Sequence, residues 1–335
     1  MKVSELGEFG LIDRLAGLAY GARDKEAESW RRLILGIGDD AAAWHGEASV
    51  QLATVDSLVQ DVHFILGLTS WGELGWRAMA ANLSDIAAMG GVPRYALVSL
   101  ALPGDTEVDD VVALYKGMIE LARSFGVAIV GGDTSRSPRL VINITILGSV
   151  KNRSQHILTR SAAKAGDKVA VTGYLGAAAA GLEVLRQHIT IDAGSGAGLK
   201  QAFLKPYPRV AEGQVLVEQG VRAAMDISDG LLGDLKHICE ASGVGARIEI
   251  ERVPVHPAVK ANFGDRALEL ALSGGEDYEL LFTAGDDVMK RVTASVSCPV
   301  TVIGEIKADK KGGITLVDRA GKEVKPAQTG WEHFK

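Results

Sequence analysis

The chain alternates short runs rich in Val and Ile with longer segments of helical period, and this alternation limits its fold more than any other feature. Segments typical of helices lie at residues 70–89, 106–125, 208–219 and 230–241. Apolar runs that predict strands lie at residues 50–58, 95–102, 127–133, 140–150, 167–173, 222–228, 246–250 and 278–283. Strands interleaved with helices favour an α/β or α+β protein over an all-helical one.

The length of 335 residues favours two domains over one. A polar stretch at residues 151–167 follows the long predicted strand that ends at Val150. We therefore expect an N-terminal domain over residues 1–150 and a C-terminal domain over residues 151–335. Residues 188–201 are dominated by Gly and Ser without a visible period, so we expect a mobile loop there.

Charge and hydropathy favour a small-molecule ligand. The net charge is −6 and the acidic residues are dispersed, which argues against nucleic acid or an anionic membrane as a partner. No apolar run approaches the roughly 18 residues that cross a bilayer, and the N-terminus lacks the apolar core of a signal peptide. We expect a cytoplasmic protein.

Several aspartates stand where an apolar run has just ended, at Asp56, Asp133, Asp226 and Asp229. Ligands of α/β sheets bind beyond the carboxyl ends of strands, so chemistry is expected there. The ordinary alternative is that aspartate is a favoured turn and N-cap residue. Asp85 is different, because it lies in a largely apolar predicted helix. A carboxylate there is costly unless it has a partner or lies on a narrow solvated stripe.

These acidic segments contain few Lys or Arg residues that could neutralise them. Two carboxylates about 4 Å apart repel by roughly 4 kcal/mol at an effective dielectric near 20, so converging aspartates need cations or protons. Ligands that are all oxygen favour Mg²⁺, which keeps positions open for phosphate oxygens. The sequence thus predicts an enzyme that acts on nucleotide phosphates, although the usual phosphate-loop and protein-kinase motifs are absent from it. The glycine turn at Gly173 and Gly176 could meet a phosphate or simply be a tight turn before a closely packed helix.

A set of motifs runs in a fixed order from residue 7 to residue 334. The set comprises GEFGLIDRL, GIGDDAA, TVDSLVQDVHF, ANLSDIAAMGGVPRYALVSLALP, IVGGDTSRSP, LTRSAAKAGD, DISDGLLGDL, SGGEDYELLFT and GWEHF. In this order the set resembles the thiamine-phosphate kinase (thiamine-monophosphate kinase) family. That family belongs to a superfamily with aminoimidazole ribonucleotide synthetase, selenophosphate synthetase and a hydrogenase maturation protein.

The resemblance implies a two-domain aminoimidazole ribonucleotide synthetase-like fold. Its N-terminal α/β half dimerises through its sheet, and a C-terminal α/β half completes the site for ATP and substrate. The implied activity is direct, in-line transfer of the γ-phosphoryl group of ATP to thiamine monophosphate, the last step of thiamine diphosphate biosynthesis. ATP is the implied donor, several Mg²⁺ ions are the implied cofactors, and the implied assembly is a homodimer.

The resemblance also implies site residues. The implied metal set is Asp40, Thr54, Val55, Asp56, Asp85, Asp133, Asp226 and Asp229. Of these, the implied catalytic residues are Asp56, Asp133 and Asp229. The implied ATP contacts are Gly132, Asp133, Arg160, Ser228 and Tyr115, and the implied contacts to thiamine monophosphate are His63, Glu276 and Trp331.

Some of these assignments have alternatives. Relatives commonly carry a hydroxyl residue where this chain has Val55, which is harmless if the position offers only its backbone carbonyl. His63 taken alone could be a structural histidine, and Trp331 a packing anchor. Of the adjacent pair Asp39 and Asp40, we expect Asp40 to bind metal and Asp39 to cap or position the turn.

Two other functions compete with the kinase. Another ATP-dependent reaction of the superfamily, such as activation of an amide oxygen, would keep the metal aspartates and change the acceptor residues. Selenophosphate synthesis is disfavoured, because no Cys precedes the GIGDD segment. A regulator that binds nucleotide without turnover is the second alternative, and the full acidic set argues against it.

Overall fold

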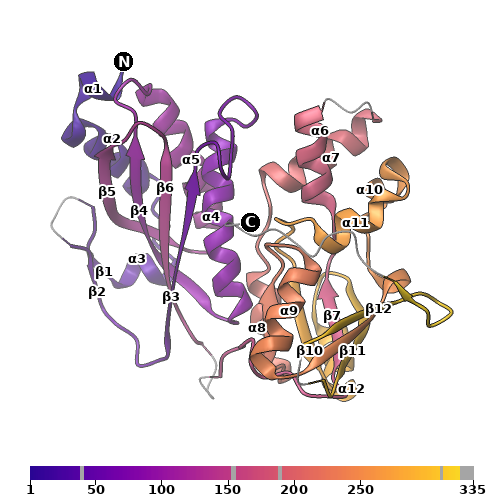
Figure 1. The fold of residues 1–335 in the computed structure, drawn as a ribbon. Coiled ribbons are helices and arrows are strands. Elements are labelled where there is room, and N and C mark those ends of the chain that lie inside the picture. Colours follow the sequence, from indigo (N-terminus) through magenta and orange to yellow (C-terminus); the bar gives the residue numbers. More distant parts are fainter. Residues whose placement is uncertain (38–40, 152–155, 188–190, 310–311, 325–335) are drawn as a thin grey trace. The chain divides into compact units, whose positions relative to one another are not determined.

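The structure, a computed structural model, describes residues 1–37, 41–151, 156–187, 191–309 and 312–324. The chain divides into two compact units, the first formed by Met1–Ile86 and Gly91–Lys151 and the second by Ala87–Gly90 and Asn152–Lys335. Figure 1 shows the helices and strands of both units. Each unit has a hydrophobic core of its own.

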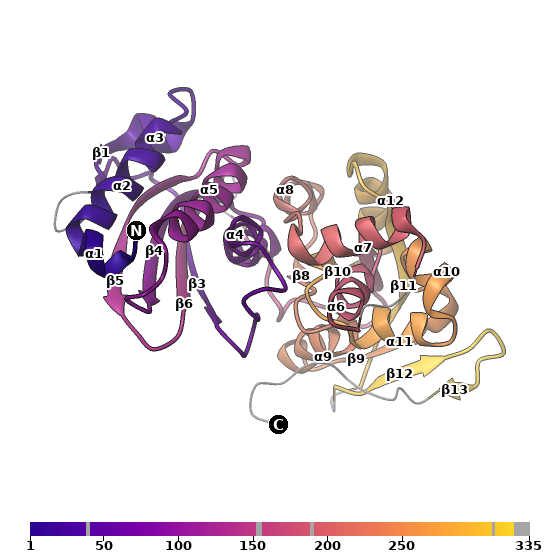
Figure 2. The same cartoon turned by 90° about the horizontal axis from the view of Figure 1, so that it is seen from above.

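The first unit is built on a four-stranded sheet with the order β3 (Gln51–Val59), β6 (Val141–Ser149), β4 (Val92–Leu102) and β5 (Ala128–Arg136). Strands β4 and β5 are parallel, and the other neighbours are antiparallel. Helices α2 (Glu8–Gly21), α4 (Trp71–Ala88) and α5 (Val108–Ser124) lie on one face of the sheet (Figure 2). Alternate residues of the strands, such as Val98 and Ile144, form the core under these helices.

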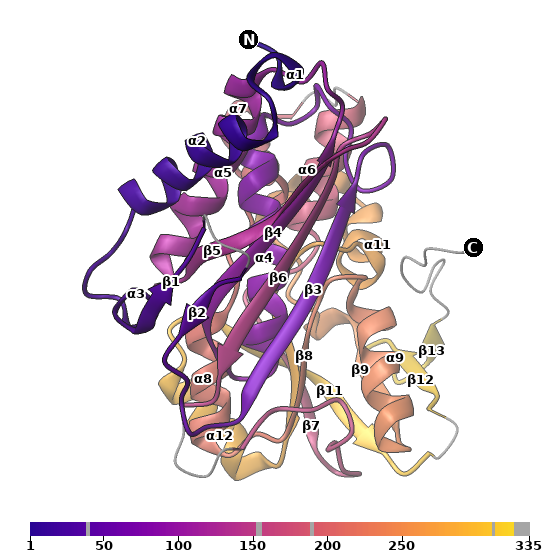
Figure 3. The same ribbon diagram turned by 90° about the vertical axis from the view of Figure 1, so that its left-hand side faces the viewer.

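The other face of this sheet is seen from the front in Figure 3. The short helices α1 (Val3–Leu6) and α3 (Glu28–Arg32) and the antiparallel pair β1 (Leu33–Leu35) and β2 (Ala43–Trp44) complete the unit. Trp44 packs against Tyr95 of β4, with ring centroids 4.6 Å apart. Trp30 of α3 joins these rings in one cluster with Ala128 and Val130 of β5.

The second unit contains a seven-stranded mixed sheet. Its order is β13 (Glu323–Val324), β12 (Ile314–Val317), β9 (Gly245–Glu249), β11 (Val300–Lys307), β7 (Lys168–Thr172), β10 (Leu280–Ala284) and β8 (Ala223–Asp226). One core joins the sheet to α6 (Ala177–Gln187), α9 (Leu231–Ser242), α10 (Pro257–Phe263) and α11 (Arg266–Ser273). Helices α8 (Val210–Gln219) and α12 (Asp286–Ser295) pack together on the other side of the sheet (Figure 2).

The mixed α/β architecture predicted from the sequence is confirmed, and the four predicted helices correspond to α4, α5, α8 and α9. The expected loop at residues 188–201 is wrong, because α7 (Ala193–Leu204) begins inside it. Asp192 caps this helix by accepting a hydrogen bond from the Ser195 N–H at 2.9 Å. Gly181 lets α6 approach α7, since a Cβ there would lie 2.0 Å from the Leu199 carbonyl oxygen. Capping and close packing therefore outweigh the low helix propensity of glycine.

Among the described residues, no helix combines the length and the apolar character needed to span a bilayer.

Candidate active site

Strand β3 and helix α4 bring three of the predicted metal ligands together. Thr54 Oγ1 donates a hydrogen bond to Asp85 Oδ2 at 2.5 Å, and the Asp56 N–H donates to Asn82 Oδ1 at 3.0 Å. Asn82 and Asp85 are three residues apart on α4 and so share a side of the helix. Thr54 and Asp56 are two apart on β3, so their side chains point to the same face. Asp85 is half-buried and has a hydroxyl partner, which explains how an apolar helix tolerates its carboxylate.

Val55 lies between these two residues, with its side chain on the opposite face of β3. This side chain is 60% exposed. A side-chain ligand at position 55 would therefore point away from Thr54 and Asp56. On the side of Thr54 and Asp56, position 55 can offer a metal ion only backbone atoms. Valine at this position therefore removes no side-chain ligand from that side.

Gly132 and Asp133 lie on β5, at the other edge of the same sheet. The register places Asp133 opposite Ser99, Ser99 opposite Asn143, and Asn143 opposite Ser57. Asp133 is thus three strand spacings from β3, roughly 14 Å, and on the face opposite the Asp56 side chain. Thr54, Asp56 and Asp85 are called the Thr54 group below. Within one copy of this unit, the structure does not bring Asp133 to this group.

Gly132 is required by close approach, because a Cβ at this position would lie 1.8 Å from the Val98 carbonyl oxygen. Any side chain would push β5 away from β4 at the residue before Asp133. The glycine therefore sets where the Asp133 carboxylate stands.

His63 and Tyr115 have different surroundings within the first unit. His63 Nδ1 accepts a hydrogen bond from the Val59 N–H at 3.0 Å, so the neutral ring carries its proton on Nε2. Arg77 Nη2 donates to the His63 carbonyl oxygen at 3.1 Å and anchors the segment after β3. Tyr115 is 5% exposed in the core under α5, and burial raises the pKa of its phenol. Its predicted contact with ATP has little side-chain surface to use and stays a prediction.

In the second unit, Asp226 ends β8, and Ser228 and Asp229 lie in the turn that follows it. Asp234, in the first turn of α9, organises this segment. Its Oδ2 accepts hydrogen bonds from the N–H groups of Ser228, Asp229 and Gly230 at 3.1, 3.2 and 3.1 Å. Burial, together with the charges of Asp226 and Asp229, raises the pKa of Asp234 to about 8. Sequence reasoning missed Asp234, and the available signal was an aspartate in the first turn of the helix directly after the motif.

Ser228 and Glu276, predicted to contact different substrates, are neighbours. The Glu276 N–H donates to the Ser228 carbonyl oxygen at 2.8 Å, and the Tyr278 N–H donates to the Ile227 carbonyl oxygen at 2.9 Å. The Ile227 N–H in turn donates to the Glu279 carbonyl oxygen at 2.8 Å. Glu276 and Tyr278 have φ of 70° and 50°, in the left-handed region that side chains rarely adopt. Such strain is typical of functional sites, where surrounding structure enforces it.

The glycine turn before α6 is occupied by the protein's own carboxylate. Asp277 accepts hydrogen bonds from the Gly176 N–H at 2.7 Å and the Ala178 N–H at 3.2 Å, and burial raises its pKa to about 7. Gly173 has a φ of 58°. These contacts favour the tight-turn interpretation over a phosphate-binding loop, because the N–H groups that a phosphate would use already have an acceptor.

An ion pair between Arg209 and Glu279 holds the segment that follows Asp277. Arg209 Nε and Nη2 donate to Glu279 Oε2 and Oε1 at 2.7 and 2.6 Å. Thr172 Oγ1 also donates to Glu279 Oε2 at 2.6 Å and accepts from the Leu280 N–H at 2.8 Å. The Glu279 side chain is 9% exposed. Nothing in the sequence pointed to this pair, whose members are 70 residues apart.

Arg160 is exposed, and its carbonyl oxygen accepts a hydrogen bond from Ser242 Oγ at 2.8 Å. The guanidinium is therefore presented on a fixed backbone. The predictions for Asp39, Asp40 and Trp331 fall outside the described residues.

Across the described ranges, no group of three or more His, Cys, Asp or Glu side chains forms a ready-made metal cage. Mg²⁺ is commonly held by one or two carboxylates and completed by water and substrate phosphates. The donor chemistry fits this ion, because the Thr54 group and the Asp226 turn offer hydroxyl and carboxylate oxygens. One oxygen of Asp234, Oδ1, is buried with no hydrogen-bond partner among the described residues.

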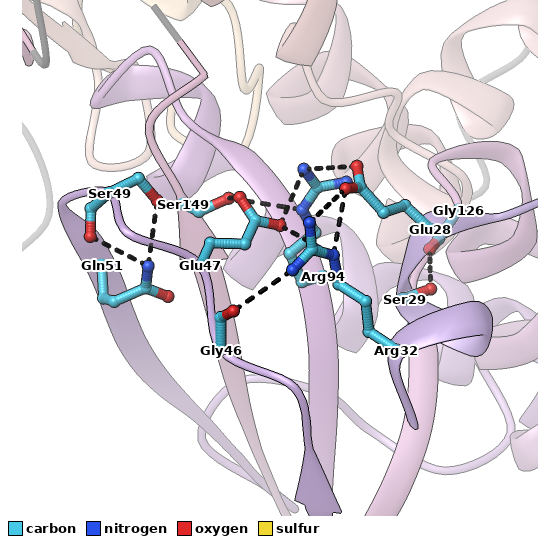
Figure 4. Close-up of polar contacts among 10 residues, drawn as sticks. All are labelled: Glu28, Ser29, Arg32, Gly46, Glu47, Ser49, Gln51, Arg94, Gly126 and Ser149. Atoms are coloured by element: carbon cyan, nitrogen blue, oxygen red, sulfur yellow. Dashed lines mark hydrogen bonds and ion pairs between the residues drawn. The ribbon is translucent and has the colours of Figure 1, made fainter. Parts of the chain in front are cut away.

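A second polar cluster in the first unit fixes the segments that flank β1 and β2 (Figure 4). Arg94 of β4 forms ion pairs with Glu28 at 3.0 Å and Glu47 at 3.2 Å, and its Nε donates to Ser149 Oγ at 3.3 Å. Arg32 forms an ion pair with Glu28 at 2.9 Å. The cluster thus ties the helix before β1 and the segment after β2 to the sheet.

Comparison with known proteins first defines the class. Residues 38–150 match the N-terminal domain of AIR synthase related proteins, and residues 164–317 match the C-terminal domain of those proteins. The two-unit α/β fold with acidic turns is therefore that of an AIR synthase related protein.

Individual relatives are more specific. The chain is 38% identical over 315 residues to the thiamine-monophosphate kinase of Bacillus subtilis (strain 168), covering 90% of this chain and 94% of that protein. A crystal structure of thiamine-monophosphate kinase from Stenotrophomonas maltophilia K279a has a TM-score of 0.80 and 36% identity, over 95% of this chain and 98% of that one. A structure of AaThiL complexed with AMPPCP and TMP has a TM-score of 0.77 and 33% identity, over 100% of this chain and 99% of that one. The chain belongs to the thiamine-monophosphate kinase family, as its motifs predicted.

Proposed function

We propose that the chain transfers the γ-phosphoryl group of ATP to the phosphate of thiamine monophosphate, producing thiamine diphosphate and ADP. The observation that carries this proposal is the likeness, over the whole chain, to the structure of AaThiL complexed with AMPPCP and TMP. AMPPCP is an analogue of ATP, and we take TMP to be the thiamine monophosphate in the relatives' name.

The reaction needs no general base, because the attacking phosphate oxygen is already ionised near pH 7. The main difficulty is to bring two polyanions together. When bound, Mg²⁺ would screen this repulsion and stabilise the charge of a loose, in-line transition state. Thr54, Asp56 and Asp85 would hold ions in the first unit, and Asp226 and Asp229 would hold ions in the second. Hydrogen bonds between β3 and α4 and within the 228–230 turn hold these residues in place, which supports this role.

The other residues would bind and orient the substrates. The exposed Arg160 would add a fixed positive charge beside the nucleotide, and Ser228 would contact it. His63 carries its proton on Nε2, so it can donate a hydrogen bond to the acceptor. Glu276 would lie beside the cationic thiazolium ring, where Trp331 would supply an aromatic face.

We also propose a homodimer in the cytoplasm. The outer face of the first sheet carries exposed side chains such as Val55, and β3 and β5 are its edge strands. A second copy packed on this face would cover the exposed apolar surface.

The test is a Mg²⁺-dependent assay of the purified protein with ATP and thiamine monophosphate. Free thiamine and the substrates of aminoimidazole ribonucleotide synthetase serve as parallel acceptors. Thiamine diphosphate and ADP should form in equal amounts from thiamine monophosphate alone. Turnover of an amide substrate would support the rival superfamily reaction, and Mg-ATP binding without any product would support a regulator.

A further inference from the structure

The two carboxylate oxygens of Asp234 have unequal surroundings. Oδ2 accepts hydrogen bonds from three consecutive N–H groups, those of Ser228, Asp229 and Gly230. Oδ1 is buried and has no hydrogen-bond partner in the described part of the chain. The whole residue is 1% exposed. An ordinary helix cap needs only the first of these oxygens, so the cap does not explain the second.

An unpartnered carboxylate oxygen in the interior is costly, and native structures supply a donor for nearly all such atoms. The charged groups around Asp234 are Asp226 and Asp229, whose charges act directly on its carboxyl group. Neither can donate a hydrogen bond when ionised. A hydrated divalent cation would provide the donor that the described residues do not, because the waters that Mg²⁺ retains are strong donors.

We propose that Asp234 is a positioning residue for a divalent cation. Its Oδ2 holds the 228–230 turn in the shape that presents Asp226 and Asp229, and its Oδ1 accepts a hydrogen bond from a water molecule on the ion. The inference deepens the proposed function, and rests on it in taking this ion to be Mg²⁺. Residues that orient metal ligands in this way commonly contribute 10–100-fold to metal affinity.

The test measures binding of Mn²⁺, which shares the oxygen ligands of Mg²⁺ and is visible by electron paramagnetic resonance. It uses the full chain without ATP or thiamine monophosphate, so it does not depend on turnover. Asp234→Asn keeps a side-chain carbonyl oxygen that can accept from the N–H groups of the turn. Its NH₂ group, which is a donor, takes the place of Oδ1 beside Asp226 and Asp229. We expect the Kd for Mn²⁺ to rise by about 10–100-fold. The melting temperature without metal should stay equal or rise, because a neutral amide replaces a group whose ionisation is unfavourable beside Asp226 and Asp229.

A matched control is Asp318→Asn. Asp318 Oδ1 also accepts hydrogen bonds from two backbone N–H groups, those of Ala320 and Lys322 at 2.9 and 2.8 Å. No metal residue is proposed in that turn. This variant should bind Mn²⁺ as the unchanged protein does, which separates loss of a turn acceptor from loss of the ion's partner.

A Kd within twofold of the unchanged protein in folded Asp234→Asn would overturn the proposal. Asp234→Ser is the second variant, and the same rise in Kd is expected. Hydrogen exchange of residues 226–235 in the unchanged protein provides a measurement without substitution. Mn²⁺ should slow this exchange, and identical exchange with and without Mn²⁺ would also overturn the proposal. If Mn²⁺ behaves as expected but no thiamine diphosphate forms, the proposed reaction fails and the role of Asp234 stands.

Discussion

Replacement of Arg209 by methionine tests whether the buried Arg209–Glu279 pair supports the second unit. The substitution leaves the Glu279 carboxylate, which is 9% exposed, with the Thr172 hydroxyl as its hydrogen-bond donor among the described residues. It also removes a positive charge 3.9 Å from Glu212. Removal of one partner from such a pair costs about 3–5 kcal/mol. Arg209→Met should therefore lower the free energy of unfolding of this unit by that amount.

Two further variants separate the effects of the Arg209 and Glu279 charges. Glu279→Gln leaves Arg209, whose side chain is 23% exposed and can reach water, so it should cost less than Arg209→Met. The double variant Arg209→Met/Glu279→Leu removes both charges and should be more stable than Arg209→Met alone. Urea unfolding followed by circular dichroism measures all three, with the transition of the second unit fitted separately because two units need not unfold together.

The control is the exposed pair Lys236–Glu240, at 3.7 Å with side chains 60% and 54% exposed. Lys236→Met should change the free energy of unfolding by less than about 0.5 kcal/mol. The reasoning is refuted if Arg209→Met costs no more than this control. It is also refuted if the double variant is no more stable than Arg209→Met, because the unpaired Glu279 charge would then not cause the loss.

Three further predictions concern other residues. Thr54→Val removes the donor to Asp85 and should raise the Mg²⁺ concentration for half-maximal activity, whereas Thr54→Ser should retain the unchanged value; equal values for both would contradict the contact. Burial raises the pKa of Asp277 to about 7, from a usual value near 4. The unfolded chain therefore loses this proton first, and the contribution of Asp277 to the free energy of unfolding falls as pH rises from about 4 to 7. Thermal melts of Asp277→Asn should show a smaller decline over that interval, and parallel curves would exclude this role. Arg94→Met leaves the carboxylates of Glu28 and Glu47 with one cation fewer and should cost about 1–3 kcal/mol in thermal unfolding of the first unit, reduced from the fully buried value by partial exposure.

Periodicity predicted the four strands of the first sheet, strands β7, β8, β9 and β10 of the second and the helices α4, α5, α8 and α9, because buried strands and amphipathic helices leave regular apolar patterns. It did not predict β11, which lies at the centre of the second sheet. It failed for α7, where residues 193–201 of the predicted loop gave no period and the decisive features were the Asp192 cap and the close approach at Gly181. Caps and helix contacts act between particular atoms, so composition does not reveal them.

The candidate site divides in the same way. Motif order led to Thr54, Asp85, Ser228 and Glu276. In the structure Thr54 is hydrogen-bonded to Asp85 in the first unit, and Glu276 to Ser228 in the second. Asp234 could not be selected by residue type, because an aspartate in a first helical turn is common. Its importance lies in three N–H groups that converge on one oxygen, and only coordinates display that convergence. The metal ligation itself stays a prediction.

The backbone hydrogen bonds between the turn after β8 and the segment around Glu276 have a kinetic consequence. Main-chain atoms of Ile227 and Ser228 join them to Glu276 and Tyr278, so the two stretches shift as one piece. With Ser228 at ATP and Glu276 at thiamine monophosphate, as proposed, a change that loosens either stretch should alter the KM for both substrates in the same direction. Because no side chain makes these links, the residues on both stretches can diverge among homologues while the coupling persists. Selection for a new acceptor would then alter nucleotide affinity as a side effect.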